Sequence, residues 1–181
     1  MPVTINGSGS IAGLSVGGLG DGAIVDAGSL AAGSVVQMQN VAISGNNVRT
    51  TTTTGSWLDN YSTTNQYQRI DFTPKFSNSK LLLLASGGLR YNSDTQGNAG
   101  YAQVRIIDAT NSNTQVAYAK YGMYAYTGGY IRSSGHWTCM SYINASSTSL
   151  RRYTCQYYFD GAQTYYYGTE GDSITVMEIK V

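Results

Sequence analysis

The sequence is poor in charge, in proline and in the strongest helix-forming residues. Of its 181 residues 12% are charged, proline occurs twice, and glutamate occurs only at Glu170 and Glu178. An average soluble domain has about 25% charged residues. Glycine (22 residues), tyrosine (16), serine, threonine and asparagine take their place. Because threonine, valine, isoleucine and tyrosine favour a pleated, half-buried surface, this composition predicts a protein built from β-strands.

The chain also lacks a strong charge of either sign and a long hydrophobic run. Its formal net charge is +1, so it has no basic field that would collect nucleic acid, and we expect no nucleic-acid partner. The longest apolar run, Leu81–Ala85, is too short to cross a bilayer, and we expect no membrane insertion. Residues 1–48 contain no Lys or Arg, so the basic start of a secretion signal is missing and synthesis in a cytosol is expected.

Residues for catalysis and metal binding are scarce. The single histidine, His136, has no G-x-S-x-G motif near it, and with Cys139 and Cys155 it still leaves a tetrahedral zinc site one ligand short. Most aspartates lie at turn positions, where turn chemistry explains them. Glu170 and Asp172 are separated by one residue and could approach a sugar. We nevertheless expect no enzymatic activity, no cofactor and no metal site.

The N-terminal part, residues 1–34, has a pattern of its own. Apolar residues are spaced by Gly, Ser and Asp, and the spacing fits neither a helix stripe nor a sustained strand alternation. Such a segment cannot bury enough surface alone, so its apolar residues need a partner to dock on. We expect a glycine-rich leader for attachment or oligomerisation, followed by a domain at residues 35–181. The candidate attachment residues are Ile5, Ile11, Leu14, Val16, Leu19 and Ile24.

From Val35 onward the sequence predicts seven or eight short strands with polar turns and no helices between them. Such a pattern is typical of an all-β fold, an antiparallel β-sandwich or jelly roll. The expected strands are Val35–Ile43, Tyr67–Pro74, Lys80–Leu89, Tyr101–Ile107, Gln115–Tyr121, Trp137–Ile143, Tyr153–Phe159 and Ser173–Val181.

Three strand patterns predict finer detail. The four consecutive leucines within Lys80–Leu89 are typical of a strand buried on both faces. A hairpin symmetric about Asn111 would place Val104 opposite Tyr118. The apolar phase of the last strand slips after Val176, which indicates a bulge or burial on both faces there.

The two cysteines fall on the apolar faces of two neighbouring strands. A hairpin centred on Ser147 would place Cys139 directly opposite Cys155, so a cross-strand disulfide is geometrically possible. We favour two reduced thiols that pack as small hydrophobic groups, because a cytosol keeps thiols reduced.

Tyrosines concentrate in two places, around residues 118–130 and at Tyr165–Tyr167. Tyrosine offers a rigid contact area with a polar tip, which suits recognition of a glycan or receptor from a loop. The candidate contact residues are Tyr124, Tyr126, Tyr130 and Tyr166. Packing of these tyrosines at strand edges or between subunits is the alternative.

Three segments resemble small C-terminal modules in tail fibres and other virion proteins of tailed bacteriophages. They are the glycine-spaced leader at residues 7–31, the segment IDFTPKFSNSKLLLLASGGL at residues 70–89, and the terminal GDSITVMEIKV at residues 171–181. The resemblance implies a β-sandwich that forms a homotrimer on the virion exterior, with the leader bound to other virion proteins. It implies a short fibre or fibre tip that contributes to attachment to host-surface glycans, since the shaft of a long fibre is absent. A capsid decoration protein and a non-viral lectin-like module are the alternatives.

Overall fold

The structure, a computed structural model, describes residues 4–5, 11–12, 30–43, 49–51, 55–60, 67–93, 99–124, 131–160, 164–167 and 172–181. The chain divides into two units, Met1–Ala31 and Ala32–Val181. In the first unit, β1 (Thr4–Ile5) pairs antiparallel with β2 (Ile11–Ala12). The functional division into a leader at 1–34 and a sandwich at 35–181 remains a prediction.

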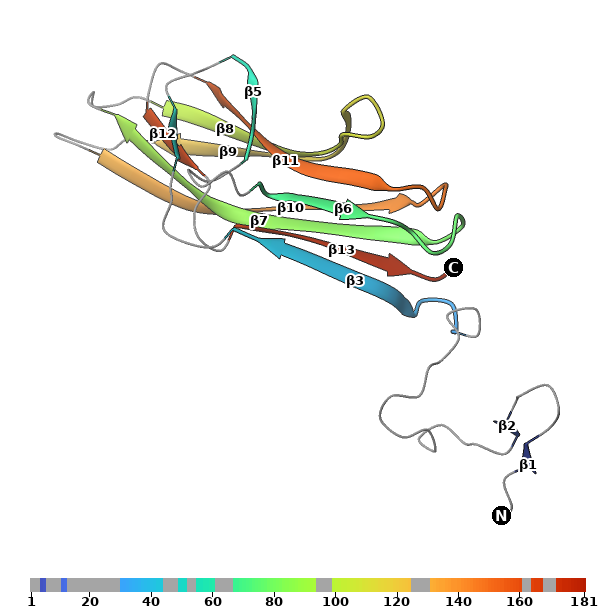
Figure 1. Ribbon diagram of the computed structural model, residues 1–181. Coiled ribbons are helices and arrows are strands. Elements are labelled where there is room, and N and C mark those ends of the chain that lie inside the picture. The colour runs from blue at the N-terminus through green and yellow to red at the C-terminus, as the bar shows by residue number, and fades with distance from the viewer. Residues whose placement is uncertain are drawn as a thin grey trace. The chain divides into compact units, whose positions relative to one another are not determined.

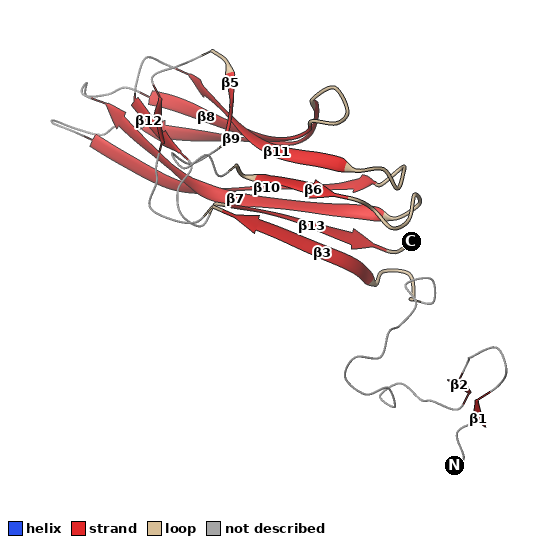
Figure 2. Ribbon diagram, in the orientation of Figure 1, coloured by secondary structure: helices blue, strands red, loops and turns tan. Residues whose placement is uncertain are grey.

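The second unit consists of two antiparallel sheets (Figures 1 and 2). The six-stranded sheet runs in the order β3 (Val35–Ala42), β13 (Ser173–Ile179), β7 (Lys80–Ser93), β12 (Thr164–Tyr167) and β4 (Arg49–Thr51), and β10 (Ile131–Asn144) pairs with β7. The five-stranded sheet runs β5 (Trp57–Asp59), β11 (Arg151–Asp160), β8 (Ala99–Asp108) and β9 (Thr114–Tyr124), and β6 (Arg69–Phe72) pairs with β11. No helix occurs among the described residues, and so none is present there that could cross a bilayer. The prediction of an all-β, antiparallel sandwich is confirmed.

The hydrophobic core fills the space between the two sheets. Alternate residues of each strand point inward, as the period of two in a strand requires. The indole of Trp137 meets the ring of Tyr157 edge-on, with centroids 5.7 Å apart. The largest contributions come from Phe72, Leu81, Leu83, Val104, Ile106, Trp137, Tyr153, Tyr157, Phe159, Ile174 and Val176, all at most 2% exposed.

Two contacts close the open sides of the sandwich. On one side β9 lies beside β10, where the Tyr121 hydroxyl accepts a hydrogen bond from Thr138 N at 2.9 Å and donates one to Thr138 O at 2.8 Å. On the other side β3 lies beside β6, and Gln37 Nε2 donates to Thr73 O at 2.8 Å. Side chains thus satisfy backbone groups at strand edges that a sheet would otherwise leave open.

The predicted hairpin between the two cysteine-containing strands is wrong. Cys139 of β10 lies opposite Ala85 in the six-stranded sheet, whereas Cys155 of β11 lies opposite Ile106 in the five-stranded sheet. The inward faces of both strands were predicted correctly. Two strands that each bury one face can face each other across a sandwich as well as pair side by side, and alternation alone does not distinguish these arrangements.

The predicted register of the hairpin of β8 and β9 holds only next to the turn. Asp108 lies opposite Thr114, as symmetry about Asn111 requires, but the register shifts by one residue between Ile106 and Ile107. Beyond this bulge Val104 lies opposite Ala119, and Tyr118 lies opposite Arg105 on the outer face. The prediction that Val104 opposes Tyr118 is therefore wrong, because one extra residue is inserted in β9.

Two predictions about burial are also corrected. Leu81 and Leu83 are fully buried, but Leu84 is 37% exposed, so the leucine run of β7 is buried on one face within this chain. The phase slip after Val176 is not a bulge at that point, because Ile174, Val176 and Glu178 continue the inward alternation. The carboxylate of Glu178 occupies an inward position, and the register irregularity lies two residues later than predicted, between Glu178 and Ile179.

Candidate functional site

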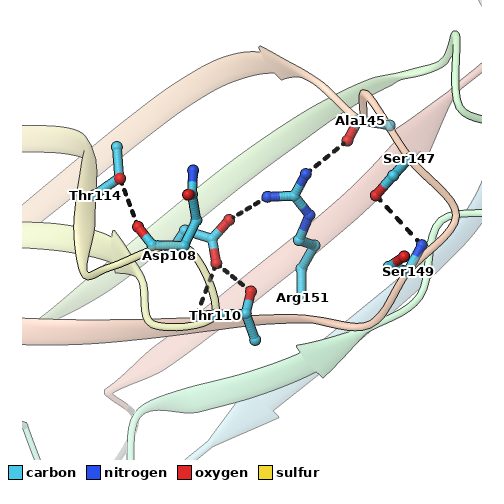
Figure 3. A network of polar contacts seen from close by, with 8 residues as sticks. Asp108, Thr110, Thr114, Ala145, Ser147, Ser149 and Arg151 are labelled. Atoms are coloured by element: carbon cyan, nitrogen blue, oxygen red, sulfur yellow. Dashed lines mark hydrogen bonds and ion pairs between the residues drawn. The ribbon is translucent and has the colours of Figure 1, made fainter.

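A pocket lies at one end of the sandwich, between the turn that follows β8 and the loop that follows β10. Its volume is about 300 Å³, at the lower end of the range for small-ligand sites. Figure 3 shows the polar contacts that position several of its residues. The lining residues are Thr110, Asn111, Ser147, Ser149, Leu150 and Arg151.

An ion pair joins the two loops that form the pocket. The Asp108 carboxylate, at the end of β8, accepts a hydrogen bond from Arg151 Nη1 at 2.7 Å (Figure 3). Arg151, the first residue of β11, also donates from Nη2 to Ala145 O at 3.3 Å. The side chain of Asp108 is 4% exposed and that of Arg151 20% exposed, so the pair is largely shielded from water. It fixes the position of the guanidinium and neutralises its charge.

The β8–β9 turn is held by its own hydrogen bonds. Thr110 N donates to Asp108 Oδ1 at 3.0 Å, and the Thr110 hydroxyl donates to the same oxygen. Thr114 N donates to Asn111 O at 2.9 Å. Asn113 has a φ of 56°, a left-handed conformation that asparagine tolerates better than most residues. These bonds hold Thr110 and Asn111 in place, so this side of the pocket is formed by the fold itself.

The pocket's chemistry suits a neutral polar ligand. Three hydroxyls and one amide line it together with a neutralised guanidinium, and Leu150, 51% exposed, adds one apolar side chain. No carboxylate, histidine or thiol is among these six lining residues, so they supply no general acid or base. Among the described residues, no group of three or more His, Cys, Asp or Glu could hold a metal ion.

The tyrosines predicted to make contacts lie elsewhere. Tyr124 is the last residue of β9, opposite Ala99, at the end of the hairpin away from the pocket. Tyr166 lies in β12, between Thr50 of β4 and Arg90 of β7. Tyr126 and Tyr130 lie outside the described residues.

The candidate attachment residues of the leader are described only in part. Ile5 of β1 lies opposite Ile11 of β2. Leu14, Val16, Leu19 and Ile24 lie outside the described residues. The role of all six residues in attachment remains a prediction.

Both cysteine thiols are free and buried in the core of the sandwich. Burial raises the pKa of Cys139 to about 11. Burial raises the pKa of Cys155 as well, and the nearby Cys139 and Asp172 raise it further. The thiolate is the reactive form of cysteine, so these shifts make both thiols poor nucleophiles.

Asp172, which from its place beside Gly171 could approach a sugar, is buried, and its burial contradicts this role. Asp172 is 1% exposed and accepts hydrogen bonds from Gly88 N at 2.9 Å and from Asn60 Nδ2 at 2.9 Å. The Tyr157 hydroxyl donates to it at 3.3 Å and accepts from Trp137 Nε1 at 3.0 Å. Asp172 is therefore part of a buried polar network that links the two sheets.

Other residues considered for chemistry do not assemble into a site. His136 is an exposed residue of β10, and Glu170 lies outside the described residues. The pocket itself was not predicted from the sequence. Its signal was present in two polar turns, residues 108–114 and 144–150, but only the pairing of strands brings these turns together at one end of the sandwich.

Comparisons with known proteins give no family. No protein-family model matches the sequence. No curated protein matches it. The structures found by similarity include particles of infectious bursal disease virus: T=1 particles derived from the virus (11% identity, TM-score 0.27), the Gx strain (11%, 0.23) and a VP2 subviral particle (10%, 0.19).

These alignments cover 79–80% of the present chain but only 35–40% of the viral chains. The chain thus spans less than half the length of the proteins it is aligned with. Similarity at these TM-scores does not indicate a shared fold family.

Proposed function

We propose that this chain is a non-enzymatic binding module that contacts a neutral glycan through the pocket between the β8–β9 turn and the β10–β11 loop. One observation carries the proposal: the pocket's hydroxyl and amide groups surround a guanidinium whose charge Asp108 already neutralises. A charged ligand would gain little electrostatic attraction from a guanidinium that is already neutralised. The hydroxyls of a sugar, in contrast, can form hydrogen bonds with both the donors and the acceptors of the lining residues. The exposed side chain of Leu150 offers contact to the apolar face of a sugar ring.

The proposed setting is the exterior of a virus particle of the tailed-bacteriophage kind, as a short fibre or fibre tip. The resemblance of residues 7–31, 70–89 and 171–181 to virion modules supports this setting. In it, the leader attaches the module to other virion proteins and the sandwich is displayed. Capsid decoration is the alternative location for the same module.

Weak single contacts suffice for this role. A pocket of this size that grips one sugar at about millimolar affinity contributes about −4 kcal/mol. Several copies on one particle raise the apparent affinity by about 10²- to 10⁴-fold without any new contact.

A glycan array probed with the intact chain tests the binding proposal. Ser149→Trp places a bulky side chain at the pocket lining, while Thr148→Trp makes the same change at the adjacent exposed residue that does not line the pocket. We expect neutral glycans to be bound by the wild type and by Thr148→Trp, and at least tenfold more weakly by Ser149→Trp. Equal binding by both variants, or a preference for charged glycans alone, contradicts the proposal.

Gold-antibody labelling of intact particles in the electron microscope tests the setting. Gold at the tail end supports the fibre or fibre-tip location, and gold over the head supports the decoration alternative. Absence of gold from intact particles contradicts the virion setting and favours the lectin-like alternative, while the glycan test remains valid in either case.

A further inference from the structure

The outer face of the six-stranded sheet carries an apolar patch on strands β10, β7, β13 and β3. Across these strands one row of neighbours consists of Tyr142, Leu82, Met177 and Met38. In the next row Met140 lies opposite Leu84. These six residues define the apolar patch, in which Met140 is 66%, Met38 59% and Tyr142 56% exposed.

The patch is almost free of charge. Beside the patch, at the outward positions from Lys80 to Ser86 of β7 and at their partners on the other three strands, the only Lys, Arg, Asp or Glu is Lys80; Arg90 and Arg132 lie further along β7 and β10. The Lys80 ammonium bonds to Asn144 Oδ1 and lies 5.7 Å from the centroid of the Tyr142 ring. A contiguous apolar surface bordered by polar residues marks an interaction site more often than a solvated face.

The outer face of the five-stranded sheet differs in kind. The Arg105 guanidinium lies 4.0 Å from the centroid of the Trp57 ring and donates to Gln156 Oε1. Gln156 Nε2 in turn donates to Asp59 Oδ1 at 2.7 Å. The Lys120 ammonium lies 4.3 Å from the centroid of the neighbouring Tyr101 ring. These charged and amide groups are readily hydrated, so the outer face of the five-stranded sheet is compatible with contact to water. The exposed apolar surface that water disfavours is therefore concentrated on the six-stranded sheet.

The features of the apolar patch fit a second copy of this chain. An uncharged face meets its own copy without like-charge repulsion, and an isologous contact needs no charge complement. Methionine and tyrosine are enriched at protein interfaces, and three of the six patch residues are of these types at exposures above half. Two sheets that pack face to face at about 10 Å give such side chains their burial.

The area is also sufficient for a modest dimer. The patch together with the rows that border it extends over four strands about 4.8 Å apart and over the seven positions from Lys80 to Ser86 of β7, at about 3.4 Å each. This face has a footprint of about 450 Å² per copy, or about 900 Å² for two copies. Side-chain relief raises the accessible area above this flat value, to near the lower limit of about 1,000 Å² for a specific interface.

We propose that two copies of the chain associate face to face through this apolar patch, related by a two-fold axis that lies between them, parallel to the plane of the six-stranded sheet. The dimer leaves the five-stranded sheet exposed on both of its outer sides. This proposal does not depend on glycan binding. It also differs from the homotrimer that the sequence resemblance implies, and the two assemblies differ in mass.

Sedimentation equilibrium of the full chain, from about 1 μM to about 1 mM, tests the proposal. We expect the wild type to change from the mass of one chain to that of two. The double variant Met38→Glu, Met140→Glu brings four carboxylates into the interface of the dimer, two from each copy. We therefore expect the dissociation constant of the dimer to rise at least tenfold. Tyr118→Glu, on the exposed face of the other sheet, is the matched control and should associate like the wild type.

Methyl NMR of methionine gives a test that needs no substitution. The chain has five methionines, of which Met38, Met140 and Met177 belong to the patch and Met1 and Met123 do not. We expect concentration-dependent shifts for the three patch methyls and constant positions for the other two. A wild type that stays a monomer throughout, a trimer, or a dimer that survives both glutamates overturns the proposal.

Discussion

The Arg151 guanidinium and the Asp108 carboxylate form an ion pair that is largely shielded from water, with an N–O distance of 2.7 Å. A second ion pair of the same sandwich has the same N–O distance but lies at the surface. That second pair, Arg152 and Asp71, also measures 2.7 Å, but its side chains are 42% and 43% exposed. Because solvent screens an exposed pair and burial makes an unpaired partner costly, the two pairs should differ in their contribution to stability despite equal geometry.

Asp108→Asn tests this difference. The substitution removes the charge from a carboxyl that accepts hydrogen bonds from Arg151 and from the amide and hydroxyl groups of Thr110. We therefore expect the free energy of unfolding to fall by about 1–3 kcal/mol. The matched substitution Asp71→Asn should have a much smaller effect. Urea unfolding of both variants measures the difference, and equal losses would contradict the structural role given to the Asp108 pair.

Glu178 predicts a specific dependence of stability on pH. It is fully buried, and burial by itself would raise its pKa. Hydrogen bonds from Lys75 N, the Ser79 hydroxyl, Phe76 N and Gln37 Nε2 outweigh that effect, so the pKa of Glu178 is lowered. A carboxyl with a lowered pKa in the folded state stabilises the protein above its ordinary pKa of about 4.3, and this contribution is lost as the pH falls through the folded-state value.

We therefore expect Glu178→Gln to reduce the free energy of unfolding by about 2–3 kcal/mol at pH 7, because the new amide group faces backbone donors. The difference between the wild type and the variant should shrink as the pH is lowered below about 4. Urea unfolding at a series of pH values measures it. If the difference in free energy of unfolding between the wild type and the variant stays constant from neutral to acidic pH, the ionised carboxylate of Glu178 does not contribute to stability.

Gly87 leaves no space for a side chain. A Cβ atom at this position would lie 2.7 Å from both Asp172 Cγ and Trp137 Cζ2. Gly87→Ala should therefore destabilise the protein by about 1–3 kcal/mol, as overpacking of a core does. Gly135, in the paired strand β10, has nothing within 4 Å of the corresponding position, so Gly135→Ala should be neutral or slightly stabilising. Thermal unfolding compares the two, and equal melting temperatures would contradict the packing described around Asp172.

The cysteines provide a test of the core. Because Cys139 and Cys155 are buried and their pKa values are raised, a thiol reagent at pH 8 should leave the folded protein unmodified over minutes. Both residues should react at once after unfolding in denaturant. Rapid modification of the folded chain, or an intact mass lower by two protons without reductant, would contradict two free buried thiols.

The sequence predicts which face of a strand is buried better than it predicts which strands pair with each other. The inward faces of β6, β10 and β11 follow from the alternation of apolar and polar residues, and Ile70, Phe72 and Trp137 on these faces are buried. Alternation is a local property, and so it could not show that β10 and β11 belong to different sheets. The bulge in β9 was equally hidden, since an inserted residue next to a turn leaves no distinct composition.

The buried carboxylates were beyond prediction for another reason. Asp172 and Glu178 are polar residues whose burial depends on donors distant in sequence, such as Gly88 N and Lys75 N. Charged residues are usually exposed, so the sequence favours the opposite assignment until these donors are located. The pocket was not predictable for the same reason, because Thr110 and Arg151 are distant in sequence and are brought together only by the fold.

The measurement that most directly tests the account is an NMR titration of the labelled full chain with a neutral oligosaccharide found on the glycan array. We predict that the backbone amide signals of Thr110, Asn111, Ser147 and Ser149 shift progressively, while those of the strand residues Gln103 and Thr138, which do not line the pocket, stay in place. Shifts centred instead on the five-stranded sheet or on the Tyr124 end of the sandwich, with the pocket unchanged, would contradict the central claim that this pocket is the binding site.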